Sequence, residues 1–215
     1  MFKYLQKVGK AFMLPIALLP AAGLLLGIGG AFSSQATIDA YPFLGNDILQ
    51  TIFKVMAGAG NIIFGNLAML LCIGIMVGLA NREKGVAALA GAVGFLVMNA
   101  TIETLLSIFN PDGDPIDTGV VGALVIGLIA VYLHNNYYNI QLPQVLGFFG
   151  GSRFVPIVTS FVAIIVGVFF FIVWPPFQHL LIAAGKYIAK LGVFGTFLYG
   201  MLMRLSGAVG LHHMI

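Results

Sequence analysis

The amino-acid sequence predicts an all-α, polytopic integral membrane protein, with about five to six transmembrane helices and one interfacial amphipathic helix. Two observations support this prediction. Apolar residues make up 60% of the 215 residues and charged residues only 8%, whereas a soluble domain carries about 25% charged residues. The apolar residues also gather in runs of the ~20 residues that a spanning helix needs. Such a chain requires a bilayer as its solvent.

The predicted spans follow one another along the chain. Five apolar runs cover residues 11–32, 55–80, 85–108, 119–134 and 154–174, and a sixth covers residues 193–211. Because the first run is longer than the apolar core of a signal peptide and further spans follow it, we expect it to stay in the membrane. Gly74 and Gly78 in the second run form a small-residue pair that indicates close helix packing.

The basic residues between the spans predict the orientation of the chain. Most acids fall on one side of the membrane, with Asp114 and Asp117 in a single loop. The cations before the first span, between the second and third, and after the fourth fall on the other side; they are Lys3, Lys7, Lys10, Arg82, Lys84 and Arg153. Because loops rich in Lys and Arg stay in the cytoplasm, the N-terminus is predicted to be cytoplasmic.

Residues 177–192 differ in kind from the spans. His179, Lys186 and Lys190 share one face of a helix, and apolar residues lie mostly on the other. A helix with a basic face and an apolar face tends to lie in the plane of the membrane surface. Pro175 and Pro176 predict a break between the fifth span and this helix. A short external helix packed on its neighbours is the alternative interpretation.

Composition and motifs argue against several function classes. The ten Lys and Arg residues are scattered, which disfavours a nucleic-acid partner. Cys72 lies inside an apolar run and is expected to be a small buried side chain, neither a disulfide partner nor a metal ligand. The sequence contains no phosphate-binding Walker loop and no dinucleotide fingerprint. No metal and no cofactor is predicted.

Arg204 is the clearest candidate functional residue, because a charged side chain within a bilayer is costly. It would either line a polar cavity and donate to a hydroxyl or carboxylate, or lie at a helix end and reach toward the membrane surface. His212 and His213 follow it, and a neutral imidazole both donates and accepts hydrogen bonds. Since adjacent helical side chains point about 100° apart, the two histidines are not expected to face one ligand. An interfacial histidine pair is the alternative.

Five segments taken together resemble one known family. They are residues 5–29 (LQKVGKAFMLPIALLPAAGLLLGIG), 117–119 (DTG), 140–157 (IQLPQVLGFFGGSRFVPI), 174–176 (WPP) and 210–213 (GLHH). In order and spacing they match along nearly the whole chain. The chain thus resembles the glucose-family enzyme IIC subunit of the bacterial phosphoenolpyruvate-dependent sugar phosphotransferase system.

The resemblance implies a permease that carries glucose, maltose or N-acetylglucosamine across the bacterial cytoplasmic membrane while the sugar is phosphorylated on its 6-hydroxyl. The phosphoryl group would come from a phosphocysteine on IIB, supplied through IIA and the carrier HPr. The assembled system would act as a protein-N(pi)-phosphohistidine-sugar phosphotransferase. The family's sugar contacts map to Arg204 and His212, with His213 as a secondary candidate.

The resemblance also implies a division of the chain. Residues 1–176 would form the N-terminal transmembrane dimerisation half of a homodimer, residues 177–192 the interfacial helix, and residues 193–215 the start of the carrier, or sugar-binding, half. The chain is expected to be truncated at Ile215, without the rest of the carrier half and without the IIB cysteine. Two other functions stay open: an ion-coupled secondary transporter that uses Arg204 and Glu103, and a non-catalytic dimerising membrane scaffold.

Overall fold

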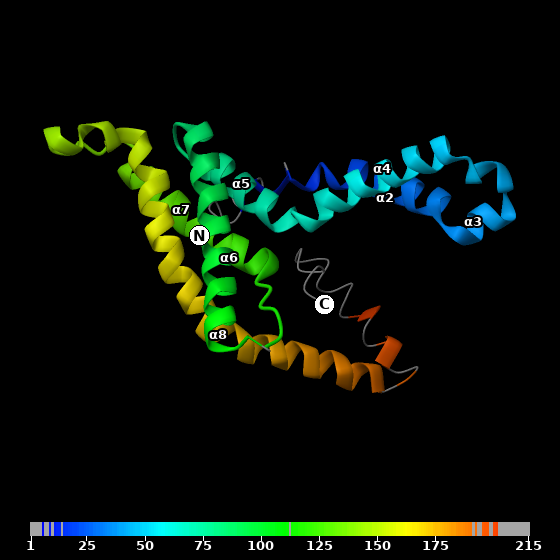
Figure 1. Ribbon diagram of the computed structural model, residues 1–215. Helices are drawn as coiled ribbons and strands as arrows, with labels where there is room; N and C mark the ends of the chain where they lie inside the picture. The colour runs from blue at the N-terminus through cyan, green and yellow to red at the C-terminus, as the bar shows by residue number, and fades with distance from the viewer. Residues whose placement is uncertain are drawn as a thin grey trace.

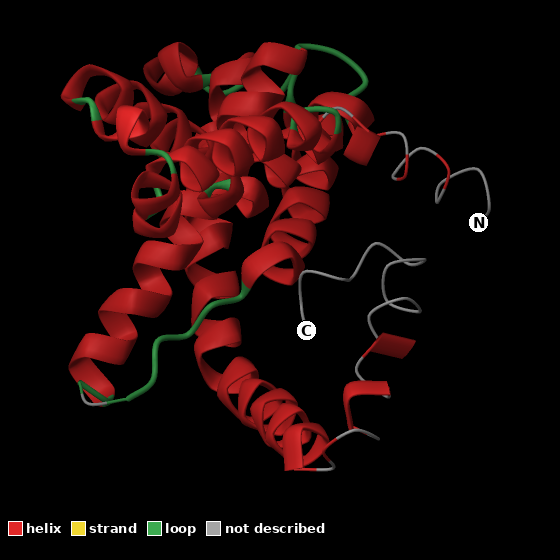
Figure 2. Ribbon diagram, turned by 90° about the vertical axis from the view of Figure 1, so that its right-hand side faces the viewer, coloured by secondary structure: helices red, strands yellow, loops and turns green. Residues whose placement is uncertain are grey.

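The computed structural model describes residues 6, 9, 11–13, 15–111, 113–190, 192, 195–197, 200 and 201. These residues form α-helices, short 3₁₀ helices, turns and loops, and no strand is present among them (Figure 2). Among the described residues, four helices are long and apolar enough to cross a membrane: α4 (Asp47–Gly65), α6 (Lys84–Phe109), α7 (Gly119–Tyr137) and α8 (Phe154–Lys190). Two apolar helices, α2 (Leu19–Ser33) and α5 (Leu67–Leu79), are shorter. The predicted all-α, polytopic fold is therefore confirmed.

Two of the predicted spans match single helices closely. Helix α6 covers Lys84–Phe109 and α7 covers Gly119–Tyr137. Just before α7, the Oδ1 of Asp117 accepts a hydrogen bond of 2.8 Å from the N–H of Gly119, the first residue of the helix, which has a φ of 48°. With 26 residues, α6 is about 39 Å long, which exceeds the ~30 Å hydrocarbon core of a bilayer. Its two ends can therefore reach opposite membrane surfaces.

The prediction of one span over residues 55–80 is wrong, because this region contains two helices. Helix α4 covers Asp47–Gly65 and α5 covers Leu67–Leu79. Asn66 separates them with φ −106° and ψ 16°, and its side-chain Nδ2 donates to the carbonyl oxygen of Ile62 at 2.8 Å. The backbone N–H of Asn66 donates to the same carbonyl oxygen at 3.1 Å, so the side chain adds a second hydrogen bond at the end of α4.

The first predicted span is also interrupted. Helix α2 begins at Leu19 and ends at Ser33, and residues 17 and 18 before it form a turn. Pro20 has no backbone N–H and its ring excludes the carbonyl group of the preceding turn, so a continuous helix cannot run through this position without distortion. After α2 the chain turns back through α3, Gln35–Ala40, and the 3₁₀ helix η1, Pro42–Gly45.

Helices α2 and α4 form a hairpin that extends away from the other long helices (Figure 1). The two backbones approach closely at Gly60, where a Cβ atom would lie 2.5 Å from the N atom of Leu26. Gly29 makes the corresponding approach to the backbone of Ala57. At the turn, buried Gln50 donates from Nε2 to the carbonyl oxygens of Phe32 and Leu44, at 3.0 and 2.8 Å. The hairpin is thus fixed at its tip and along its length.

Helices α5, α6, α7 and α8 form a bundle with two clusters of buried apolar side chains. One cluster contains Ile75, Met76 and Val155, and the other contains Met98 and Ile126. Small residues let α6 approach its neighbours: a Cβ at Gly94 would lie 2.8 Å from Thr159 Cγ2, and one at Gly167 would lie 3.0 Å from the carbonyl oxygen of Met98. The predicted close packing at Gly74 and Gly78 is confirmed, against Pro15 and Ala11 respectively.

The predicted helix break at Pro175 and Pro176 is wrong, because α8 runs without interruption over Phe154–Lys190. The prolines bend it instead: the yellow part of α8 in Figure 1 runs down along the bundle, and the orange part turns away to the side. Trp174 stacks against residues on both sides of it, with ring centroids 5.7 Å from Phe170 and 5.2 Å from Phe177. These contacts hold the helix together where the prolines remove backbone hydrogen bonds.

Candidate functional site

The residues predicted to contact substrate, Arg204 and His212, and the secondary candidate His213, lie outside the described residues. Their placement therefore stays a prediction. Helix α8 precedes them in the chain and ends at Lys190. Beyond the bend in α8, His179, Lys186 and Lys190 have exposed side chains, and so do Leu180, Ile182 and Tyr187. Whether this part of α8 lies in a membrane surface also stays a prediction.

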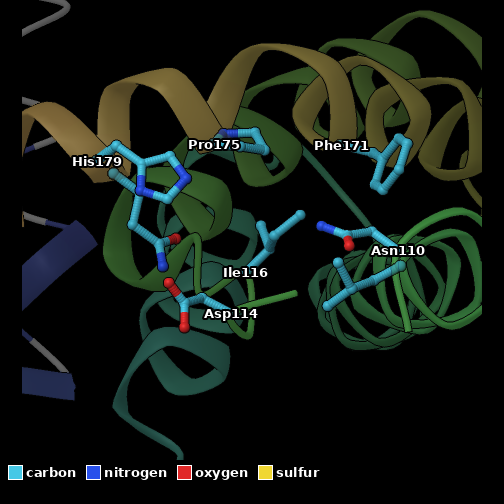
Figure 3. A pocket seen from close by; sticks show the side chains of 8 residues that line it. Asn110, Asp114, Ile116, Phe171, Pro175 and His179 are labelled. Atoms are coloured by element: carbon cyan, nitrogen blue, oxygen red, sulfur yellow. The ribbon is translucent and has the colours of Figure 1, made fainter. Parts of the chain in front are cut away.

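A small hollow lies at the bend of α8 (Figure 3). It has a volume of about 110 Å³ and is formed by the end of α6, the loop between α6 and α7, and the bent part of α8. Its walls combine apolar and polar side chains; they are Leu106, Asn110, Asp114, Ile116, Phe171, Pro175, Gln178 and His179. The hollow therefore lies where the acidic loop between α6 and α7 meets the proline bend of α8.

Gln178 joins the two sides of this hollow. Its Nε2 donates to the carbonyl oxygen of Pro115 at 2.9 Å, which ties the segment after the bend to the α6–α7 loop. Its Oε1 is buried and has no hydrogen-bond partner. A buried polar atom without a partner is costly, and the hollow has room for several water molecules. The hollow is therefore suited to hold water. Asp114 and His179 are exposed at its rim.

The other end of the bundle carries a rigid basic turn between α5 and α6. Asn135 of α7 accepts from the N–H of Asn81 at 2.9 Å and donates to the carbonyl oxygen of Leu79 at 3.2 Å. The Nε2 atom of His134, which is fully buried, lies 2.8 Å from the carbonyl oxygen of Arg82. Because a carbonyl can only accept, Nε2 of His134 carries the hydrogen.

This bracing fixes an uncommon backbone shape. Glu83 has a φ of 49°, a left-handed conformation that costs a non-glycine residue energy and persists where its surroundings enforce it. The side chains of Arg82 and Lys84 are both exposed. The turn therefore presents two cations in a fixed geometry at the end of α6 opposite the hollow.

Two other residues of the sequence analysis have clear positions. Cys72 is fully buried and its Sγ lies 3.4 Å from the carbonyl oxygen of Gly91, as expected for a small packed side chain. Glu103 is exposed on α6, outside the packed interior of the bundle. It is therefore not placed to line an ion path between the described helices.

Sequence reasoning missed both polar arrangements described here. The hollow joins Asp114 to His179, and the predicted topology had placed both on the same side of the membrane. Their predicted position on the same side of the membrane was the one indication in the sequence that Asp114 and His179 lie near each other. The basic turn is held by hydrogen bonds from His134 and Asn135. In the sequence these two residues stand out only as a polar pair at the end of an otherwise apolar run.

One comparison with known protein families matches almost the whole chain. The family model described as Phosphotransferase system, EIIC matches residues 9–215. The match includes the described helices and also the segment that contains Arg204, His212 and His213.

Proposed function

Because the chain belongs to the EIIC family of the phosphotransferase system, we propose that it is the membrane subunit of a glucose-type permease of the bacterial cytoplasmic membrane. The family carries sugar transport coupled to phosphorylation, with IIB and IIA components as partners. The substrates we propose are glucose, maltose or N-acetylglucosamine. The observation that supports this proposal best is the family match, which runs through a chain of long apolar helices.

The proposed sugar contacts follow from the needs of a neutral, polyhydroxylated ligand. Inside a bilayer the protein must replace the water that such a ligand loses. The guanidinium group of Arg204 would donate to hydroxyl oxygens, and the imidazole of His212 would donate and accept. His213 is the secondary candidate. The bent helix α8 leads toward this segment, so a change in its bend would move the segment relative to the bundle.

We further propose that the protein acts as a homodimer, with a cytoplasmic N-terminus. The outer side of the α2–α4 hairpin supports the dimer. A Cβ atom at Gly23, Gly27 or Gly30 would meet nothing within 4 Å, so this side of α2 is open to a second helix. Small residues at such spacing allow close helix approach in lipid. The two ends of α6 support the orientation, since one end carries Arg82 and Lys84 and the other leads to Asp114.

The experiment is phosphoenolpyruvate-dependent uptake of labelled glucose, maltose and N-acetylglucosamine into membrane vesicles. The vesicles contain the full-length protein, with IIA, IIB and HPr supplied. Accumulation of one sugar as its phosphate supports the proposal and identifies the substrate. Proton-coupled uptake without a phosphate donor would assign the protein to the secondary carriers instead. A correctly inserted dimer that binds none of the sugars would favour a scaffold.

Substitution of Arg204 tests the site itself. Loss of a hydrogen bond from a charged donor costs about 1.5–3 kcal/mol, so Arg204→Ala should weaken sugar binding by roughly ten- to a hundredfold. Lys84→Ala is the matched control, because it removes a cation whose side chain is exposed at the start of α6. Equal affinities of the two variants would remove Arg204 from the sugar site.

A further inference from the structure

The loop between α7 and α8 exposes an unusual amount of apolar surface. Its centre is the 3₁₀ helix η2, Gln144–Phe149, which buries none of its residues. Val145 is 94% exposed and Phe148 is 71% exposed, and Leu146 and Phe149 are exposed as well. Single exposed apolar residues are ordinary, but a contiguous apolar patch marks a surface that something covers.

The patch has a fixed shape. The N–H of Gly151 donates to the carbonyl oxygen of Ile140 at 2.8 Å, which closes the base of the loop. Arg153 donates from Nη1 to the carbonyl oxygen of Phe148 at 3.3 Å, and its guanidinium lies 4.9 Å from the centre of the Phe148 ring. The apolar side chains are thus presented by a folded loop, because both its base and its tip are held.

The position of the loop indicates what covers it. In Figure 1 the loop is the lime-coloured segment that stands out sideways from the bundle, near the level at which α6 begins. It leads into α8, which exposes Phe161, Ile164 and Ile165 from its eighth residue onward. In a membrane-spanning helix these side chains contact lipid. The patch therefore lies in the loop that leads into a helix with a lipid-facing surface further along.

The charge of the loop favours phospholipid over protein as the covering partner. Residues 138–153 include no Asp or Glu, and Arg153 is their one charged residue. A cation beside exposed aromatic rings suits the boundary between phosphate groups and acyl chains. The exposed side chains of Arg82, Glu83 and Lys84 together add one net positive charge at the same end of the bundle.

We propose that η2 is a membrane-surface anchor. Val145, Leu146, Phe148 and Phe149 enter the acyl boundary of the leaflet on the basic side of the protein, and Arg153 contacts the phosphate groups of phospholipids there. The anchor fixes the start of α8 at the membrane surface. The far end of the same helix is bent by Pro175 and Pro176, so one end of α8 is held while the other can change direction.

Tryptophan fluorescence tests this proposal. Trp174 is the one tryptophan of the 215 residues. A background in which Trp174 and every other tryptophan of the full-length protein are replaced by Phe is silent, and Phe148→Trp or Val145→Trp is placed into it. The full-length protein is reconstituted in phospholipid vesicles, with or without bromine on the upper acyl carbons. Brominated lipid should quench the new tryptophan about twofold, and aqueous iodide should quench it little. Arg82→Trp in the same background is the control, because that side chain lies on the polar turn.

Each outcome decides the proposal. Quenching by brominated lipid at high lipid-to-protein ratio supports the anchor. Quenching by iodide as strong as that of the Arg82→Trp control would place the loop in water and overturn it. Protection from both quenchers would mean that a second copy or a partner protein covers the loop, which also overturns it. Val145→Trp keeps the test available if Phe148→Trp does not fold, since Val145 makes little contact with the rest of the chain.

The part played by Arg153 has its own readout. In mixed vesicles, brominated anionic lipid should quench the new tryptophan about two- to fivefold more strongly than brominated zwitterionic lipid, since one basic residue attracts anionic lipid by this order. The preference should be lost in Arg153→Gln, with quenching by total lipid retained. Equal quenching by both lipids in the chain that keeps Arg153 would overturn the assignment of phosphate contact to this residue.

Discussion

Replacing Gly60 by Ala should force α2 and α4 apart. The new Cβ atom would lie 2.5 Å from the N atom of Leu26 and 2.7 Å from the carbonyl oxygen of Ala22. Both are backbone atoms, so no side-chain rotation relieves the contact. Overpacking of this kind costs about 1–3 kcal/mol.

Gly58→Ala is the matched control in the same helix. A Cβ atom there would meet nothing within 4 Å, so this variant gains only the helix preference of Ala over Gly, about 0.5–1 kcal/mol. Gly60→Ala makes the same gain. The difference between the two variants therefore isolates the clash, and the Gly60→Ala protein should be less stable than the Gly58→Ala protein by about 1–3 kcal/mol.

The assay is a titration of the reconstituted protein with a denaturing detergent, followed by helical circular dichroism. Amide hydrogen exchange of α2 and α4 adds a local readout, because an opened hairpin loses protection there before the bundle does. Equal stability and equal protection in the two variants would show that the backbones of α2 and α4 do not approach at Gly60.

Three further predictions concern the ends of the bundle. Arg82→Cys and Asp114→Cys should react with an impermeant thiol reagent from opposite sides of the membrane, and reaction from one side would contradict the spanning of α6. Asn135→Ala removes two hydrogen bonds to the basic turn, so it should destabilise that turn by about 1–2 kcal/mol; amides of the turn should then exchange faster, and unchanged exchange would show that α7 does not brace it. The double variant Pro175→Ala and Pro176→Ala restores two backbone donors, so spin labels on either side of the bend should move further apart, and an unchanged distance would assign the bend to tertiary contacts.

The sequence predicted the helices whose ends carry a clear polar signal. Helix α7 begins after Asp117 and α6 begins at Lys84, and each contains one uninterrupted apolar run. The break at Asn66 was missed because apolar residues flank it on both sides, so hydropathy alone does not reveal it. The residue at the break is local in its bonding, since the side chain of Asn66 donates to the carbonyl oxygen of Ile62 in the preceding turn.

At the prolines of α8 the sequence predicted a break that the structure does not have. Pro175 and Pro176 remove backbone donors, which predicted an end to the helix. Trp174 packs against Phe170 and Phe177, four residues before it and three residues after it in the same helix, and the helix changes direction there without ending. The candidate site was predictable only in part. Arg204 stands out because it is a charge in an apolar run, whereas the hollow near Gln178 depends on a contact between distant parts of the chain.

The α2–α4 hairpin has a consequence for the order in which the protein is assembled. All its internal contacts join residues between Leu19 and Gly65, so it is complete once α4 has left the ribosome. Contacts between near neighbours in sequence form fastest, and translation adds about 5–20 residues per second. The hairpin therefore has seconds in which to close before α8 is synthesised. The bundle of α5, α6, α7 and α8 then assembles beside a preformed arm, and α8, the last of these four to be made, is the helix whose far half bends away.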